Sequence, residues 1–186
     1  MPTYCFAIVP TALGAFGAAW SEAGIVRTWL HDRTVEQTRA HIRRELRGAV
    51  ESPPPPDVAD ALADVVALLA GQPRVPTAPL DLRAVPDFDR RVYALARTIL
   101  PGETLTYGAV AKQLGEEPMR ARDVGVALSR NPFAPIVPCH RIVAANGNLG
   151  GYSAPGGVQT KRRLLELEGA AVVAPPPAPA QAGLFD

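Results

Sequence analysis

The sequence predicts an α+β protein of two small units, a strand-and-helix unit at residues 1–84 and a helix-turn-helix unit at 85–170. Its 186 residues have room for one medium domain or two small ones. Short apolar runs divided by turn residues open the chain, which is typical of antiparallel strands. Two short helices joined by a tight glycine-containing turn follow in the second half, which is the helix-turn-helix pattern. Residues 171–186 are rich in Pro and Ala without periodicity and predict a disordered tail.

The first unit begins with three strands. Apolar or alternating runs predict them at residues 3–9, 12–19 and 24–30. Pro10-Thr11 and Glu22-Ala23-Gly24 separate these runs and supply the turns. The short spacing between the runs favours antiparallel pairing.

Two helices complete the first unit. Thr34 caps a helix that runs to about Leu46. After the four-proline loop at residues 53–56, Asp57 opens a second helix that stops at Gly71. This unit shows no set of residues that would form a catalytic site.

The second unit follows a proline-rich link at residues 71–86, which contains a candidate short strand at 80–82. Periodicity and capping residues then predict helices at 88–100, 106–114, 119–129 and 159–168. Between the last two, residues 141–157 indicate a strand and a glycine-rich turn, arranged like a wing beside the helix pair.

Charge is distributed unevenly along the chain. The formal net charge is only +1, but residues 119–163 hold seven basic residues against Asp123 alone. A cationic segment indicates an anionic partner such as nucleic acid. A solvated surface that keeps the protein in solution is the alternative.

Composition argues against a membrane protein, a secreted protein and a metalloprotein. No apolar run is long enough for a transmembrane helix, and the first residues lack the pattern of a signal peptide. We therefore expect a cytoplasmic protein. Cys5, His31, His41 and His140 show no metal-ligand spacing, so we expect no metal and no cofactor.

Residues Pro138-Cys139-His140-Arg141 are the strongest candidate for chemistry. They follow the apolar run 134–137. A thiolate is the reactive form of cysteine, and a neighbouring His or Arg lowers the thiol pKa. The alternative is a small buried thiol, because free cysteine is among the most buried residue types. The surrounding residues decide between these interpretations.

Those residues resemble one family, the O6-alkylguanine-DNA alkyltransferases, also called methylated-DNA–protein-cysteine methyltransferases. The matching stretch runs from about residue 88 to residue 169, with its motifs in the family's order and close to its spacing. The motifs occupy residues 101–108, 122–125, 131–132, 136–143, 150–153 and 161–169. The resemblance implies a ribonuclease-H-like domain followed by a winged-helix catalytic domain.

The resemblance also implies direct DNA repair. Its partner would be double-stranded DNA that contains O6-alkylguanine, with O4-alkylthymine as a further candidate substrate. The alkyl group would pass to Cys139, which is not regenerated, so that each molecule acts once. His140 would take the thiol proton through a water, and Glu168 would orient the histidine, as in the nucleophile–base–orienter logic of a hydrolytic triad.

Further roles follow from the same resemblance. Tyr107 would donate a hydrogen bond to the flipped guanine, Arg122 would enter the duplex in place of the extruded base, and Asn131 would tie the recognition helix to the active-site strand. The expected DNA contacts are Arg120, Ala121, Arg122, Gly125, Arg130 and Arg141, and the expected base pocket is Leu128, Ile142, Tyr152 and Ser153.

Two regions depart from or extend the pattern. Ala154-Pro155 lengthens the pocket loop and Ala134 replaces a proline found in some relatives, which leaves open how bulky a substituent the site accepts. Gln181-Ala182-Gly183-Leu184-Phe185 resembles the short peptide with which bacterial repair proteins bind the sliding clamp. A plain disordered end is the alternative for this peptide.

Two other functions were weighed. A non-catalytic recogniser of alkylated DNA would lack the acceptor cysteine, whereas Cys139 is present. A transcription regulator that senses alkylation through Cys139 would need a regulatory or dimerisation region, and the tail is too short to supply one. We therefore expect a monomeric, single-turnover alkyltransferase.

Overall fold

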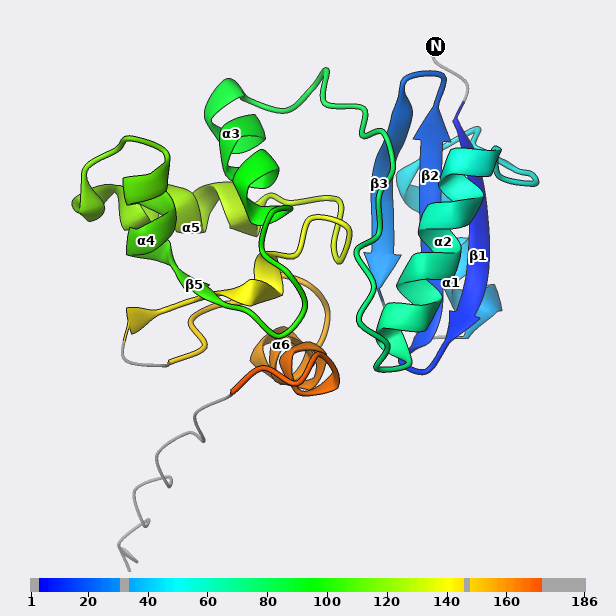
Figure 1. The fold of residues 1–186 in the computed structure, drawn as a ribbon. Coiled ribbons are helices and arrows are strands. Elements are labelled where there is room, and N and C mark those ends of the chain that lie inside the picture. Colours follow the sequence, from blue (N-terminus) through cyan, green and yellow to red (C-terminus); the bar gives the residue numbers. More distant parts are fainter. Residues whose placement is uncertain (1–3, 31–33, 146–147, 172–186) are drawn as a thin grey trace, which may run out of the picture.

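The computed structural model describes residues 4–30, 34–145 and 148–171. A four-stranded sheet with helices α1 and α2 forms one unit, and helices α3 to α6 form the other (Figure 1). The sheet order is β3-β2-β1-β4. The α+β class predicted from the sequence is confirmed.

The sheet is built from two antiparallel hairpins and a short parallel edge. Its strands are β1 Cys5–Thr11, β2 Gly14–Ser21, β3 Gly24–Leu30 and β4 Val50–Glu51. The first hairpin turns at Ala12-Leu13, where the hydroxyl of Thr11 donates to the carbonyl of Gly14 over 2.7 Å. The expected turn at Pro10-Thr11 is wrong. Pro10 stays in β1 because β4 pairs only with the start of that strand, so its missing N–H leaves no partner unsatisfied.

The two helices of this unit cover opposite faces of the sheet. Helix α1, Val35–Glu45, begins with a capping box between Thr34 and Gln37 and packs its buried Ile42 with Phe6 and Trp29. Helix α2, Pro56–Leu69, packs against the other face. Its buried side chains are Val58, Ala61, Leu62, Val65, Leu68 and Leu69. The sheet is therefore enclosed on both sides.

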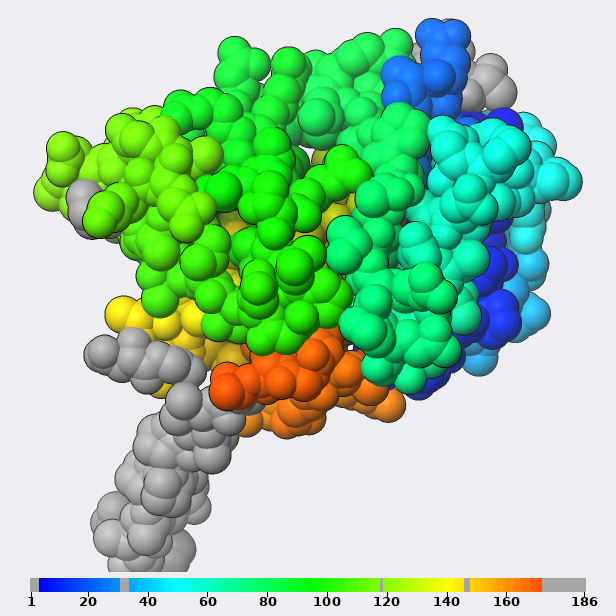
Figure 2. All heavy atoms as spheres, viewed as in Figure 1, coloured from blue at the N-terminus to red at the C-terminus, as the bar shows by residue number. Residues whose placement is uncertain are grey.

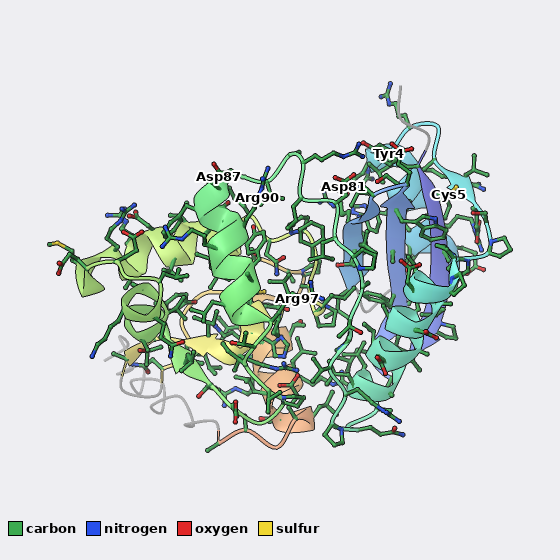
Figure 3. All side chains as sticks on the ribbon, turned by 45° about the horizontal axis from the view of Figure 1, so that its top comes forward. Tyr4, Cys5, Asp81, Asp87, Arg90 and Arg97 are labelled. Atoms are coloured by element: carbon green, nitrogen blue, oxygen red, sulfur yellow. The ribbon has the colours of Figure 1, made fainter. Side chains whose placement is uncertain are left out.

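The link at residues 71–86 runs along the edge of β3. Ile25 donates its N–H to Pro79 (2.9 Å), and Asp81 donates its N–H back to Ile25 (2.8 Å). Only an isolated parallel bridge between Ile25 and Leu80 forms where we expected a short strand. Asp81 also accepts a hydrogen bond from the hydroxyl of Ser21. Figure 3 shows Asp81 beside the strands of the sheet and Arg97 at the end of α3. The link thus attaches the second unit to the sheet.

Four helices, two 3-10 turns and two short strands form the second unit. They are α3 Asp87–Ala96, β5 Leu105–Thr106, α4 Tyr107–Gln113, η1 Pro118–Arg120, α5 Ala121–Ser129, η2 Cys139–Arg141, β6 Ile142–Val143 and α6 Gly157–Leu167. Helix α3 ends four residues before the predicted residue 100, and hydrogen-bonded turns continue it as far as the buried Ile99. Helices α4 and α5 form the expected helix-turn-helix.

The segment expected to form a wing contributes one very short strand. β6 pairs in parallel with β5, through Leu105 with Ile142 and Thr106 with Val143. Its glycine-rich turn includes residues 146–147, which lie outside the described residues. The pairing places the segment after Cys139 directly beside the start of α4.

One buried apolar cluster joins the two units. It includes Phe16 and Leu62 from the first unit and Val92, Val110 and Cys139 from the second. Figure 2 shows α2 and the link in direct contact with the helices that follow. Among the described helices, none has the length and apolar character needed to cross a membrane.

A buried threonine connects the sheet to the loop that leads to Cys139. The N–H of Thr28 donates to the carbonyl of Pro132 (2.8 Å), and its hydroxyl donates to the carbonyl of Ala134 (2.6 Å). These bonds join β3 to the second unit across more than 100 residues of sequence.

We predict that Thr28→Val lowers the free energy of unfolding by about 1–3 kcal/mol, because it leaves a buried carbonyl without its donor. Urea denaturation measures the change. Thr28→Ser keeps the hydroxyl and is the control. Equal losses of unfolding free energy in the two variants would show that the hydroxyl's hydrogen bond is not the cause.

Candidate active site

Cys139 lies at the floor of a cavity in the second unit. The residue is 6% exposed and begins η2, directly after Pro138. The cavity has a volume of about 680 Å³. Its lining residues are Tyr107, Ala121, Arg122, Gly125, Val126, Leu128, Ser129, Cys139, Gly151, Tyr152 and Ser153. A planar ligand that enters this cavity can therefore reach the thiol.

A buried ion cluster lies behind the cysteine. Nε2 of His140 is 2.8 Å from Oε1 of Glu168, and Arg141 donates from Nε and Nη2 to the same carboxylate at 2.8 Å each. The three side chains are at most 2% exposed. Glu168 ends α6, and the other two residues belong to η2. The cluster therefore clamps the end of the last helix to the turn that carries Cys139.

Electrostatics fix the protonation of this cluster. Burial alone would raise the pKa of Glu168, but hydrogen bonds from His140 and Arg141 outweigh it and lower that pKa to about 2. Burial lowers the pKa of His140 despite the neighbouring carboxylate. An ionised carboxylate only accepts, so Nε2 of a neutral His140 carries the hydrogen. Its Nδ1 is then a buried acceptor with no partner among the described residues.

The thiol itself is held in an environment that disfavours its charge. Burial raises the pKa of Cys139, whereas Asn131, Lys161 and Tyr152 act to lower it. Asn131 is fixed by its own bonds: its Nδ2 donates to the Val137 carbonyl at 2.9 Å, and its Oδ1 accepts the Phe133 N–H at 2.9 Å. The thiol therefore needs a base to take its proton.

Lys161 is a site residue that the sequence analysis missed, since it was counted in the cationic segment and in the last family motif but was given no role in the site. It is 1% exposed, and its Nζ donates to the carbonyls of Ile142 (2.6 Å) and Gly151 (3.3 Å). Burial lowers its pKa to about 8. Its spacing from the buried Leu164 and Leu165 places it on the inner face of α6, and that spacing was the available signal.

Tyr107, the first residue of α4, lines the cavity. Burial raises the pKa of its hydroxyl, and Nζ of Lys161 lies 5.6 Å from its ring centroid. Gly150, at φ +70°, leaves room for the ring, because a Cβ there would approach it to 3.0 Å. The hydroxyl therefore keeps its proton and remains a donor.

Helix α5 forms the outer wall of the cavity. Leu128 lines it, as the resemblance implied, and so do Ala121, Arg122 and Gly125, which were expected to contact DNA. Arg122 is exposed and forms no ion pair with a described residue. Arg120 directly precedes this helix and Arg130 directly follows it, and both already form ion pairs with carboxylates. Arg120 contacts Asp123 at 2.7 Å, and Arg130 contacts Asp89 at 2.9 Å.

Two expected site residues lie elsewhere. Arg141 was expected to contact DNA, but it is 1% exposed and bound to Glu168 and to the carbonyl of Ile99 (2.6 Å). Ile142 was expected in the pocket, but it is fully buried in the core behind Cys139. Both expectations are wrong, because η2 turns Arg141 inward and the strand β6 that follows it buries Ile142. Tyr152 and Ser153 line the cavity as expected.

Comparison with known proteins agrees with this site. Residues 87–170 match the family model described as 6-O-methylguanine DNA methyltransferase, DNA binding domain. The methylated-DNA–protein-cysteine methyltransferase of Mycobacterium tuberculosis is 41% identical over 155 residues, which cover 83% of this chain and 82% of the relative. The chain belongs to the methylated-DNA–protein-cysteine methyltransferase family. A second relative, from Mycolicibacterium paratuberculosis, is 37% identical and covers 86% of this chain and 89% of its own.

Solved methyltransferase structures share the whole fold. The crystal structure of Mycobacterium tuberculosis O6-methylguanine methyltransferase has a TM-score of 0.71 at 34% identity and covers 99% of this chain and 100% of its own. A structure of the Mycobacterium tuberculosis protein OGT in complex with DNA has a TM-score of 0.69 at 36% identity, with 89% and 92% covered. Within the described residues of this methyltransferase, no cluster of three or more His, Cys, Asp or Glu side chains could hold a metal ion.

The Glu168 cluster predicts a pH dependence of stability. Because the pKa of Glu168 falls from 4.5 to about 2 on folding, its contribution is complete above pH 4.5 and is lost as the pH falls towards 2. The contribution is on the order of 3 kcal/mol.

Urea denaturation of Glu168→Gln and the parent between pH 2 and 7 measures this contribution. We expect the variant to be less stable at pH 7 and the gap to close below pH 4.5. Glu166→Gln, at an exposed position of the same helix, is the control. A gap independent of pH would contradict the assignment.

Proposed function

We propose that this protein repairs DNA by direct reversal, with Cys139 as the residue that receives the alkyl group from O6 of guanine. The observation that carries this proposal is a buried thiol at the floor of a cavity, backed by a buried His140–Glu168 pair. Membership of the methyltransferase family supports the same reaction. O4-alkylthymine is a second candidate substrate.

His140 would activate the thiol. Its Nδ1 is a buried acceptor without a described partner, and a water between this atom and Sγ of Cys139 would carry the proton. The histidine is neutral before the reaction, because burial lowers its pKa, so it is able to accept that proton. Glu168 would stabilise the imidazolium that forms, and it stays ionised throughout because its pKa is about 2.

Transfer would then proceed by displacement. The thiolate of Cys139 attacks the alkyl carbon, an S–C bond forms, and the bond from that carbon to O6 breaks. The guanine gains one proton in exchange for the one the thiol lost. Tyr107 would donate to the leaving base, a role that its raised pKa permits. As the family resemblance implies, the alkylated thiol would not be regenerated, so each molecule would react once.

The substrate base must leave its duplex to react. Cys139 is 6% exposed, so a base stacked in DNA cannot approach it. Arg122 would fill the gap in the duplex, while the small Ala121 and Gly125 let the DNA backbone come close to α5. Arg120 and Arg130 would add less phosphate attraction than Arg122, because each is already paired with a carboxylate. Binding would weaken as salt rises.

Residues 181–185 lie outside the described residues, and we propose from their sequence that they bind the sliding clamp. Ala182 occupies a position where such peptides often have leucine. We also propose that the protein is a cytoplasmic monomer.

We predict that Cys139→Ser abolishes transfer of a labelled methyl group from O6-methylguanine duplex to protein, because serine is a far weaker nucleophile. Binding to the duplex, followed by fluorescence anisotropy, should remain within a few-fold of the parent value. Cys5→Ser removes the other cysteine and should transfer normally. Transfer that persists in Cys139→Ser, or stops in Cys5→Ser, would contradict the proposal.

For the clamp peptide, we predict that Phe185→Ala weakens binding of the full chain to immobilised clamp by about tenfold or more, because an aromatic anchor is lost. Ala182→Leu should strengthen it. Surface plasmon resonance measures both, and equal binding by all three chains would exclude this peptide as the contact.

A further inference from the structure

The outward face of the helix-turn-helix carries an apolar residue that the proposed reaction does not use. Met119 is 85% exposed, more than any other large apolar side chain among the described residues. It lies in η1, three residues before Arg122 and seven before Val126. Arg122 and Val126 lie one turn apart on α5, and Met119 lies in the turn that leads into this helix; we call these three residues the α5 stripe. Figure 1 shows the corner between α4 and α5 at the end of the molecule farthest from the sheet.

The α5 stripe continues to the mouth of the active-site cavity. Arg122 and Val126 both line the cavity, and Val126 is itself 45% exposed. Because a base must pass this mouth to reach Cys139, the DNA beside that base must lie on the stripe. Met119 is three residues before Arg122, in the turn that leads into α5, and its side chain is 85% exposed, so a duplex that covers Arg122 would reach it.

The charges around Met119 also favour nucleic acid as the occupant. Arg122 has no ion pair to a described residue, whereas Arg120 is turned away towards Asp123 and the ring of Phe88. The stripe therefore presents one free cation between two apolar side chains. Proteins that bend DNA from the minor groove combine arginine with apolar wedges in this way, and methionine is one of the residues that serve.

We propose that Met119 is a wedge that enters the minor groove and unstacks the base step next to the flipped nucleotide. This inference rests on the proposed function. The wedge would offset part of the cost of extruding the base, because burying an exposed methionine on DNA removes apolar surface from water. It would act only on a duplex, since a single strand has no paired step to open. Met119 would thus be a positioning residue that favours lesions in duplex DNA.

The test uses O6-methylguanine duplexes with 2-aminopurine at a neighbouring step, whose fluorescence rises when that step unstacks. Binding of the parent protein should raise the fluorescence. Met119→Gln, which keeps the length but adds polarity, should remove most of the rise and slow transfer from duplex by about tenfold. Transfer from the single-stranded oligonucleotide should stay within about twofold. Leu100→Gln, at another exposed apolar position outside the stripe, should change neither.

Arg122→Ala serves as the positive control for a residue at the mouth. If Arg122→Ala slows duplex repair while Met119→Gln does not, the wedge is excluded and the proposed function stands. Equal losses on duplex and single strand in Met119→Gln would also overturn the wedge. If the parent protein takes no methyl group from the O6-methylguanine duplex, the proposed function itself fails. This measurement comes before any variant is tested.

Discussion

One carboxylate holds the reactive part of this molecule together. Glu168 accepts hydrogen bonds from both residues that follow Cys139, and all of these side chains are sealed from solvent. A buried charge without a partner is strongly unfavourable. Replacing one of these three side chains would therefore leave a charge buried without its partner and lower the stability of the fold. The last helix, the turn that carries Cys139 and the end of α3, through the carbonyl of Ile99, are therefore coupled in one network.

The same burial shapes the chemistry. Burial raises the pKa of the thiol and lowers that of His140, so that both groups are neutral in the resting protein. Charge separation would occur when the proton moves to His140, beside a carboxylate that is already ionised. The first unit contributes indirectly, because Thr28 braces the loop that leads into Cys139. Because the Cys139 thiol would react only once, its burial would protect it until the substrate base enters the cavity.

Rules that use only nearby residues in the sequence predicted much of this structure. The direction in which some side chains point could not be predicted in this way. The Thr34 cap, the helix-turn-helix and the residues around Cys139 follow from capping residues, periodicity and motif order. Arg141 and Ile142 were misplaced because the tight turn η2 sends a charged side chain inward and the short strand β6 after it buries an apolar one. Lys161 was missed because charge alone suggested an exposed side chain, although its helical spacing placed it inside. The burial of these three residues depends on contacts between distant segments.

The central claim is that Cys139 is consumed once by the alkyl group it removes. The most direct measurement is the intact mass of the unmodified protein after incubation with excess duplex that contains one O6-methylguanine, followed by peptide mapping. The account predicts a gain of one methylene group per molecule, located on the peptide that holds Cys139. A gain on another peptide, more than one methylene per molecule, or tight binding with no gain in mass would contradict it.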